Sequence, residues 1–508
     1  MVFSFLLLAA AAGRSRARAA TAGGRRAAAG SPSGPKTVFL RSPDNPLVAI
    51  RVLFRVGSVD DPKGKEGLAA LTAEMIGRGG SQARSYAEVL DALYPMAAQI
   101  GVYADKESAV FEGMVHRDNV EAFAELIAQQ ILTPRLAEED FTRIKQDAVD
   151  SITKTLRGNA DEELGKQAMA SLLFAGHPYG WPSQGTVAGL QAITLDDVRQ
   201  FFEAHYAQDR MIVGVAGGYP DGFAETFAAR FASLPAASAP RPALPRPPAS
   251  KGTQVLIVQK DARADAISVG HAINVTRSDP DFYALTVARS YLGEHRTFSG
   301  VLMNELRGRR GLNYGDYAYV ENFIQDGWTT FPLPNIPRRQ QHFELWLRPV
   351  PPQNSLFALR AALYHTDKLI REGIPAEGFE GTKTFLMNYA DLWTQDVSRR
   401  LGYAMDAAIY GKDLIGELQA RLPRMKKAEV DRAIRKHLSV SNLSIAIVAQ
   451  DGAALQARLL SGQPTPITYD TAGTPPEVLA QDRLIEKYRL PVAKNAVRVV
   501  PVDQLFER

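Results

Sequence analysis

Cysteine is absent from the 508 residues, and histidine is scarce, with eight residues in all. The lack of cysteine excludes disulfides, thiolate metal sites and a cysteine nucleophile. It leaves the compartment open, because a cysteine-free chain suits an oxidising or a reducing environment. The two nearest histidines, His342 and His365, are 23 positions apart. No two histidines therefore share a helical turn, as a helix-borne zinc site requires, and a site built from distant histidines has no spacing in its support.

Long apolar runs and concentrated charge are also missing. After the N-terminus, no stretch has the roughly 18 apolar residues that a membrane-spanning helix needs. The net charge is +4, and no basic stripe is interleaved with aromatic residues, so no nucleic-acid partner is expected. A nucleophile elbow, a phosphate-binding glycine loop and a dinucleotide fingerprint are absent as well. With 45% apolar and 22% charged residues, the composition is that of an ordinary globular protein.

The first 36 residues read as a signal-like and disordered segment. Residues 2–12 form an apolar run long enough for the core of a signal peptide, and Ala17-Arg18-Ala19 has the form of a cleavage site. The nearby arginines follow the apolar run, whereas a signal peptide has its basic residues before it. We expect a periplasmic or secreted protein, with a cytoplasmic location as the alternative.

A proline- and alanine-rich segment, residues 235–253, predicts a semi-rigid linker. It separates a first half, residues 37–234, from a second half, residues 254–465, and a tail, residues 466–508, matches neither. Short matches recur in both halves in the same order, which indicates an internal repeat. The matched pairs are Ala70-Leu71-Thr72 with Ala284-Leu285-Thr286, Phe141 and Lys145 with Phe379 and Lys383, and Val198 and His205 with Val430 and His437.

Each half shows strand patterns first, then long helices, then a last helix and strand. Residues 47–58 read as a strand, for example, and residues 376–401 as one long helix. This order predicts an α+β fold of two homologous halves, each a mostly antiparallel sheet with helices packed on one face.

The stretch 292–317 joins a helical pattern to a strand pattern rich in aromatic residues. Gly311 is predicted to stop the helix. Arg307 then lies at the helix end, and Tyr314 lies in or just before the strand. A guanidinium and a phenol are both donors that suit a developing oxyanion or a peptide carbonyl. From spacing alone the plain alternative stays open, in which the arginine pairs with the helix dipole and the tyrosine belongs to the core or to a sheet edge.

This stretch resembles the second-half signature of the pitrilysin/insulinase family of zinc peptidases, the inverzincins. The resemblance implies that an Arg and a Tyr seven positions apart bind substrate and stabilise the transition state, and these are Arg307 and Tyr314 here. One departure is Phe298-Ser299-Gly300, where the family often has Ser-Ser-Arg. The matching pieces are Leu292–Gly293, Phe298–Leu302, Leu306–Arg307 and Arg310–Tyr314.

The zinc motif of that family, H-x-x-E-H, is degenerate in this sequence. Residues 56–80 keep its frame, but Ala70 and Glu74 stand where the resemblance implies the two zinc-binding histidines, and Ala73 stands where it implies the general base. The region expected to give the third ligand, between Glu139 and Glu162, contains no glutamate. We therefore expect this chain to hold no metal and no other cofactor.

The resemblance implies two related halves that close as a clamshell. It also implies, for members of this length, heterodimers in which one chain brings the zinc helix and the other the Arg and Tyr. The sequence is accordingly predicted to be a zinc-free subunit, inactive alone, of a zinc metalloendopeptidase that cleaves extended peptides. A homologous H-x-x-E-H partner carries the zinc and the base, while Arg307 and Tyr314 complete its site. The alternative is a structural or peptide-binding scaffold subunit without a catalytic contribution; an independent enzyme with an unrecognised site has no motif in its support.

Overall fold

The computed structural model describes residues 34–241, 243–249, 251–325, 330–470 and 472–508. The predicted signal-like segment, residues 1–36, lies outside this part except for its last three residues. Within the described residues, no helix combines the length and the apolar character needed to cross a bilayer.

The first half builds a five-stranded sheet of order β1-β5-β2-β4-β3, in which only β1 and β5 run parallel. Its strands are β1 (Lys36–Arg41), β2 (Leu47–Phe54), β3 (Gly101–Ala104), β4 (Ala109–His116) and β5 (Met211–Gly217). Its helices are α1 (Leu68–Arg78), α2 (Tyr86–Leu93), α3 (Val120–Leu132), α4 (Glu138–Asp150), α5 (Asp161–Leu173), α6 (Val187–Ala192), α7 (Leu195–His205) and α8 (Phe223–Ala229).

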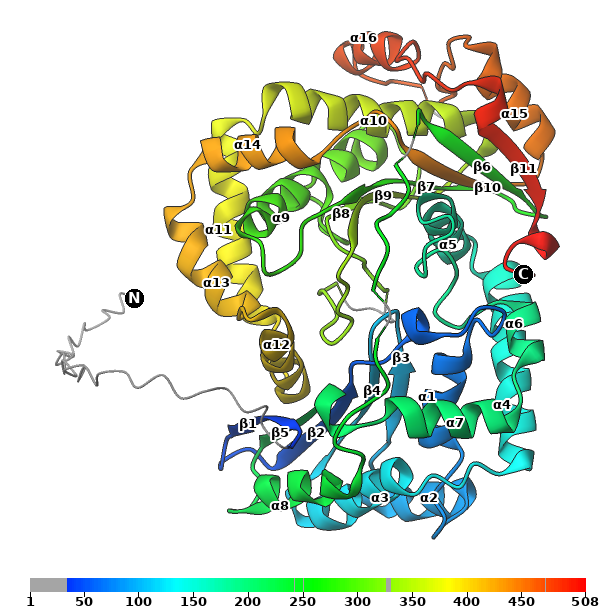
Figure 1. The fold of residues 1–508 in the computed structure, drawn as a ribbon. Coiled ribbons are helices and arrows are strands. Elements are labelled where there is room, and N and C mark those ends of the chain that lie inside the picture. The colour runs from blue at the N-terminus through cyan, green and yellow to red at the C-terminus, as the bar shows by residue number, and fades with distance from the viewer. Residues whose placement is uncertain (1–33, 242, 250, 326–329, 471) are drawn as a thin grey trace, which may run out of the picture. The chain divides into compact units, whose positions relative to one another are not determined.

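The second half repeats this strand order and adds one strand, giving β11-β6-β10-β7-β9-β8 (Figure 1). Its strands are β6 (Gln254–Gln259), β7 (Asp265–Ile273), β8 (Asp316–Tyr319), β9 (Gln341–Val350), β10 (Ser444–Ala449) and β11 (Val497–Pro501). Its helices are α9 (Pro280–Gly293), α10 (Ser355–Glu372), α11 (Ala376–Leu392), α12 (Val397–Tyr410), α13 (Leu414–Arg421), α14 (Lys427–His437), α15 (Gly452–Ser461) and α16 (Pro476–Ile485).

The two halves are homologous, as the internal repeat predicts. The three pairs of sequence matches fall on α1 and α9, α4 and α11, and α7 and α14. Even a local contact is repeated, because the Lys145 ammonium lies 5.4 Å from the Phe141 ring centre and the Lys383 ammonium lies 5.0 Å from that of Phe379. The α+β class with two sheets is therefore confirmed.

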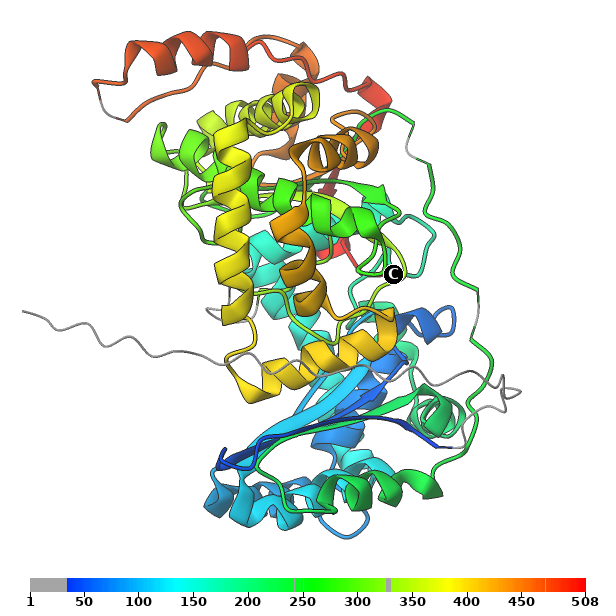
Figure 2. The same ribbon diagram turned by 90° about the vertical axis from the view of Figure 1, so that its left-hand side faces the viewer.

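One helix of each half also covers a face of the sheet of the other half. Strand β2 is buried on both faces. Ala49 and Leu53 pack against α12 of the second half, while its even-numbered residues pack against helices of its own half. In the second sheet, the face away from α9 and α10 packs against α5 of the first half. Figure 2 shows α12 lying across the blue strands of the first sheet. A strand that is buried on both faces needs apolar cover on both, and this exchange provides it.

Glycines allow the exchanged helices to approach the sheets closely. A side chain at Gly214 of β5 would come within 2.5 Å of the Met405 sulfur on α12. At Gly270 of β7 it would come within 2.9 Å of the Met169 sulfur on α5. Each sheet therefore has a gap where the incoming helix lies.

The C-terminal tail ties the two halves together. Strand β11 extends the second sheet in parallel to β6, and the chain end then returns to the first half, beside α6 (Figure 1). There the Arg157 Nε donates to the Leu505 carbonyl at 2.8 Å, and the Val187 amide donates to the Phe506 carbonyl at 3.0 Å. Leu505 and Phe506 are buried in the core of the first half.

The prediction of a single helix over residues 376–401 is wrong. The chain forms α11 and α12 with a break between them, and the Asp396 carboxylate caps α12 by accepting the Arg399 amide at 3.0 Å. An aspartate at this position satisfies an amide that the helix itself leaves unpaired. The break lets α12 leave its own half and reach the first sheet.

Truncating a residue of α12 tests the exchange. Leu401 is 0% exposed and packs on the first sheet, so Leu401→Ala is expected to lower the free energy of unfolding by about 3 kcal/mol, as for other buried leucines. Because each half buries a helix of the other, urea unfolding is expected to remain one transition for both halves. The matched control is Leu392→Ala on α11, which is 41% exposed and should change the stability by less than about 1 kcal/mol. Two separate transitions would contradict the exchange as a source of cooperativity.

Candidate functional site

Helix α1 carries the degenerate zinc positions. Gly67 precedes it with a φ of +109°, and the Asp61 carboxylate accepts the Gly67 and Ala69 amides at 2.8 and 2.7 Å. These bonds satisfy amides that the first turn leaves unpaired. Of the predicted positions, Ala73 is buried, whereas Ala70 and Glu74 line a cavity of about 300 Å³ between α1, α4 and β3.

At the degenerate zinc positions, the positive charge comes from the guanidinium of Arg78. Arg78, one turn after Glu74, has its Nη1 3.3 Å from the Glu74 Oε2 and its Nη2 3.2 Å from the Asp147 Oδ2. Asp147 lies on α4, 73 positions after Glu74, close to where the resemblance implies the third zinc ligand. Burial raises the pKa of Glu74, and Arg78 opposes that rise. Arg78 was not predicted as a site residue from the sequence, although its i,i+4 spacing from Glu74 was a usable signal.

These residues do not fit a zinc ion. Zinc sites in proteins use nitrogen, sulfur and carboxylate ligands, and a catalytic site takes three of them from the protein. Here two alanines bring no ligand atom, and the two carboxylates already share Arg78. Across the described residues, no cluster of three or more histidines, cysteines or carboxylates could hold a metal.

The second candidate region is the turn between α9 and β8. Residues Met303–Gly308 form a π-helix that ends where Gly311 takes a φ of +65°. The Gly311 amide donates to the Arg307 carbonyl at 2.9 Å, and the Leu312 amide donates to the Leu306 carbonyl at 3.1 Å. These bonds resemble a Schellman cap in which each span is one residue longer, as π geometry requires. The predicted helix stop at Gly311 is confirmed, and Tyr314 lies two residues before β8.

Arg307 and Tyr314 differ from their neighbours in ion pairing and in exposure, respectively. Tyr314 is 78% exposed, although the strand that follows it is buried. The Arg307 guanidinium lies 4.9 Å from the centre of the Phe298 ring and 4.0 Å from the Met303 sulfur, and among the described residues it has no carboxylate partner. Phe298, the departure from the family pattern, is itself 68% exposed. The turn thus presents a cation, a phenol and an aromatic ring to the outside.

His295 lies close to Arg307 in the sequence but not at the surface. Its side chain is fully buried among Tyr317, Phe323 and Trp346. Its Nδ1 lies 2.7 Å from the Tyr319 hydroxyl. Burial, reinforced by nearby cations, lowers its pKa to about 3. A neutral ring in an aromatic cluster supports the sheet and cannot reach a substrate outside it.

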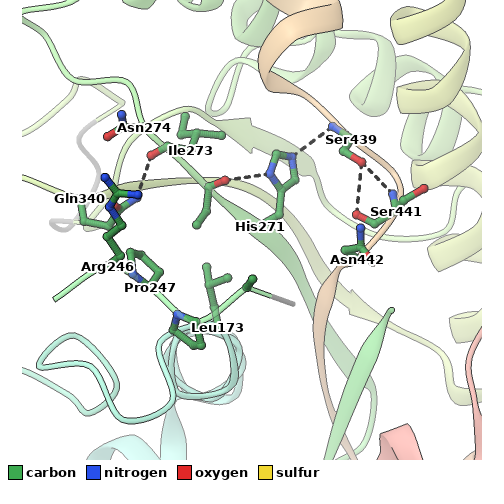
Figure 3. A pocket seen from close by; sticks show the side chains of 13 residues that line it. Leu173, Arg246, Pro247, His271, Ile273, Asn274, Gln340, Ser439, Ser441 and Asn442 are labelled. Carbon is green, nitrogen blue, oxygen red and sulfur yellow. Dashed lines mark hydrogen bonds between the residues drawn. The ribbon is translucent and has the colours of Figure 1, made fainter. Parts of the chain in front are cut away.

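Another cavity, of about 730 Å³, is distinct from both regions. Linker residues 246–249, the end of β7 and residues 439–442 surround it (Figure 3). The His271 Nε2 accepts the Ser439 amide at 3.2 Å, and burial lowers the pKa of this histidine. Among the described residues, no carboxylate lines the cavity. A neutral histidine without an acidic partner makes this a gap under the linker rather than a reaction centre.

Comparison with known families gives two matches in chain order. Residues 36–177 match the model described as Insulinase (Peptidase family M16), and residues 192–385 match the one described as Peptidase M16 inactive domain. The second match includes Arg307 and Tyr314. Together the two matches cover well over half of the chain.

Curated relatives are distant and named as proteases. An uncharacterized zinc protease of Mycobacterium leprae is 25% identical over 301 residues, which are 58% of this chain and 66% of that protein. The uncharacterized zinc protease YmxG of Bacillus subtilis is 22% identical over 298 residues, 59% of this chain and 71% of that protein. The mitochondrial-processing peptidase subunit beta of Dictyostelium discoideum is 22% identical over 171 residues, 34% of this chain and 36% of that protein.

Solved structures share the fold. A crystal structure of a peptidase M16 inactive domain from Pseudomonas fluorescens has a TM-score of 0.71 at 21% identity and covers 82% of this chain and 95% of its own. A protease from Helicobacter pylori has a TM-score of 0.69 at 17% identity and covers 82% of this chain and 97% of its own. The two family models and the shared fold lead to one conclusion: the chain belongs to the insulinase family of peptidases, family M16, as a member without the H-x-x-E-H ligands.

Proposed function

We propose that this chain is the zinc-free subunit of a two-chain zinc peptidase. A homologous H-x-x-E-H subunit supplies the zinc ion, which activates water for attack on the peptide bond. Arg307 and Tyr314 of this chain complete that site by donating hydrogen bonds to the scissile or a neighbouring carbonyl of an extended peptide. The apolar N-terminal run supports an exported complex, in the periplasm or outside the cell.

The proposal rests on Arg307, which has no ion-pair partner among the described residues. Its neighbour Arg310 is buried and ion-paired, with its Nη1 3.0 Å from the Glu305 Oε2 and its Nε 2.8 Å from the Asp482 Oδ1. Arg307 has no such partner among the described residues and stacks on exposed Phe298 instead. An arginine that only stabilises the fold is expected to be paired as Arg310 is. An arginine without such a partner is free to bind a carbonyl or a carboxylate.

The turn that carries Arg307 and Tyr314 is held in place by side-chain contacts on its helical side and on its strand side. Arg310 connects the helical side of the turn to Asp482 on α16. On the strand side, the side-chain amide of Asn313 donates to the Asp316 carboxyl at 2.6 Å. The Asn313 side chain also donates to the Arg348 carbonyl of β9 at 3.1 Å. Donors for a transition state are effective when their positions are fixed in advance, and these contacts provide that support.

The competing function is a scaffold subunit without any catalytic contribution. The loss of the zinc ligands on α1 is compatible with it. Exposed Tyr314 and unpaired Arg307 favour the catalytic function, because a scaffold has no need for an exposed phenol and an unpaired guanidinium on a turn that is held in place.

Substitutions in the assembled complex test the proposal. The chain is to be combined with an H-x-x-E-H homologue from the same genome, the product of an adjacent gene first, and peptide hydrolysis is measured. Tyr314→Phe, which removes only the hydroxyl, is expected to lower kcat by about 10² to 10³, the loss typical of an oxyanion donor. Arg307→Ala should cause a comparable loss in kcat/KM.

Matched controls separate this role from general damage. Tyr94→Phe changes another highly exposed tyrosine, and Arg309→Ala changes an exposed arginine two positions from Arg307. Both should leave turnover unchanged within about twofold. If Tyr314→Phe and Arg307→Ala also leave turnover unchanged in a complex that assembles normally, the scaffold function is correct and the proposal is wrong.

The pH dependence of stability tests the anchoring of the turn. Burial raises the pKa of Asp316 to about 8, whereas an unfolded aspartate has a pKa of about 3.9. Between these values the folded state holds a proton that the unfolded state releases, so this residue makes stability fall as pH rises, by at most about 1.4 kcal/mol per pH unit. Asp316→Asn keeps an acceptor for Asn313 and cannot ionise. Urea unfolding from pH 5 to 8 should therefore show a shallower decline for this variant, whereas exposed Asp118→Asn should keep the decline of the original chain.

A further inference from the structure

A third cavity, of about 110 Å³, lies between the two halves of the chain. The first half contributes residues 104–106 at the turn between β3 and β4, one side of α5, and the loop that follows α5. The second half contributes residues 322–324, Arg338 and the first part of β9. Most of the side chains that line it are polar or charged, so the cavity suits water or a polar ligand.

Several charged groups in the walls are paired with one another. The Arg338 guanidinium donates to both oxygens of Asp105 at 2.8 and 3.0 Å, and the Ser183 hydroxyl donates to the same carboxylate at 2.9 Å. The Lys106 ammonium donates to the Trp181 carbonyl. These four side chains are therefore satisfied without a ligand.

Two buried acceptor atoms on β9 have no partner. His342 and Glu344 both line the cavity, and they lie on the same face of the sheet because they alternate along the strand. The His342 Nε2 lies 3.3 Å from the Glu344 Oε2 and donates to it in the tautomer that carries the proton on Nε2. The His342 Nδ1 and the Glu344 Oε1 are then acceptors, and neither has a hydrogen-bond partner in the described part of the chain. This wall needs a donor.

Two buried donor atoms belong to the other walls, on Lys166 of α5 and on Asn322 after β8. The Lys166 Nζ and the Asn322 Nδ2 have no hydrogen-bond partner among the described residues. The Lys166 ammonium lies 3.8 Å from the centre of the Trp346 ring, which stabilises the charge but offers no lone pair. The Glu163 Oε2 is also 3.8 Å away, beyond hydrogen-bond distance. These walls need an acceptor.

The two charged members of this set have opposite signs. Lys166 is 6% exposed and Glu344 is 2% exposed, and within the described residues no ion pair joins them. Buried polar atoms without partners are costly, and buried ions more so. Water would supply hydrogen bonds but no opposite charge. A small molecule with an ammonium at one end and a carboxylate at the other supplies both.

We propose that this cavity binds a free α-amino acid with a small side chain. Its ammonium donates to Glu344 and His342, and its carboxylate accepts from Lys166 and Asn322. A cavity of about 110 Å³ leaves no room for a longer peptide. Because Lys166 belongs to the first half and the other three residues to the second, the bound molecule connects the two halves. This site goes beyond the proposed function, since it requires neither a metal nor a partner chain.

Titration calorimetry on the isolated full chain tests this inference, with glycine and L-alanine as separate probes. At least one of them is expected to bind saturably at one site per chain. The controls are the same molecules without the ammonium, acetate and propionate, and without the carboxylate, methylamine and ethylamine. Each control should bind at least about tenfold more weakly than its parent amino acid, because it leaves one charged wall unpaired.

Variants of the cavity locate the binding. Lys166→Met keeps a long side chain and removes the positive charge, whereas Glu344→Gln removes the negative charge at nearly the same size. Ala170→Leu fills the space beside α5. Each should weaken binding by about tenfold or more, and the exposed controls Lys154→Met and Glu139→Gln should not change it. Circular dichroism and the urea midpoint verify that each variant is folded.

Three results would overturn the inference. The first is that neither glycine nor L-alanine binds, which would leave the cavity to water alone. The second is that the controls without an ammonium or a carboxylate bind as tightly as the amino acid. The third is binding that Lys166→Met and Ala170→Leu leave intact.

The outcomes also separate this site from the one proposed for Arg307 and Tyr314. Arg307→Ala and Tyr314→Phe should bind the amino acid as the original chain does, whatever their effect on turnover in the two-chain complex. Binding that is lost in Arg307→Ala and kept in Lys166→Met would overturn the inference while leaving the proposed function in place.

Discussion

The exchange of α5 and α12 between the two halves is the constraint on which the rest of the structure depends. Both sheets are buried on both faces, and each has its second face covered by a helix from the other half. Arg338 adds to this connection, since its Nη2 lies 2.8 Å from the Oδ1 of buried Asp105 in the first half. A buried charge pair is costly to break because the remaining partner would be left uncompensated. Neither half can therefore be lost without exposing the core of the other.

This constraint explains why a half that has lost its zinc ligands persists in the chain. Residues 34–234 support the second sheet through α5 and through the contacts of the C-terminal tail, whatever chemistry α1 performs. With the metal ligands replaced, the cation between Glu74 and Asp147 is Arg78, a permanent charge that needs no cofactor. The proposed function leaves the chemical work of this chain to the second half, where the turn after α9 carries Arg307 and Tyr314.

Local patterns in the sequence predicted much of the fold and the local setting of Arg307 and Tyr314, at a helix end and just before a strand. Gly311 marks the end of a helix because its positive φ suits glycine, and the paired motifs of the two halves fall on equivalent helices. The break before α12 was missed, since the pattern of residues 376–401 is helical on both sides of Asp396. The strand β9 was missed as well. It places the polar pair His342 and Glu344 in a buried position, 3.3 Å apart, and such a pair does not look like a strand core.

Long-range placement could not be predicted from the sequence. Nothing local shows that α12 covers the first sheet, that His295 lies inside an aromatic cluster, or that β11 from the tail joins the second sheet, because each depends on residues that are distant in the chain. The contacts of Arg78 could be predicted only in part. The i,i+4 spacing indicates its contact with Glu74, whereas its contact with Asp147 depends on the packing of α1 against α4. The sequence therefore identified the candidate residues more completely than it identified their surroundings.

The most direct test of this account is the zinc content of the purified chain on its own, measured by elemental analysis after exposure to excess zinc and removal of the unbound metal, with peptide hydrolysis measured on the same sample. The account predicts zinc far below one equivalent and no hydrolysis, because α1 offers Ala70, Ala73 and a carboxylate already paired with Arg78. One equivalent of tightly bound zinc, together with hydrolysis by the chain alone, would contradict it.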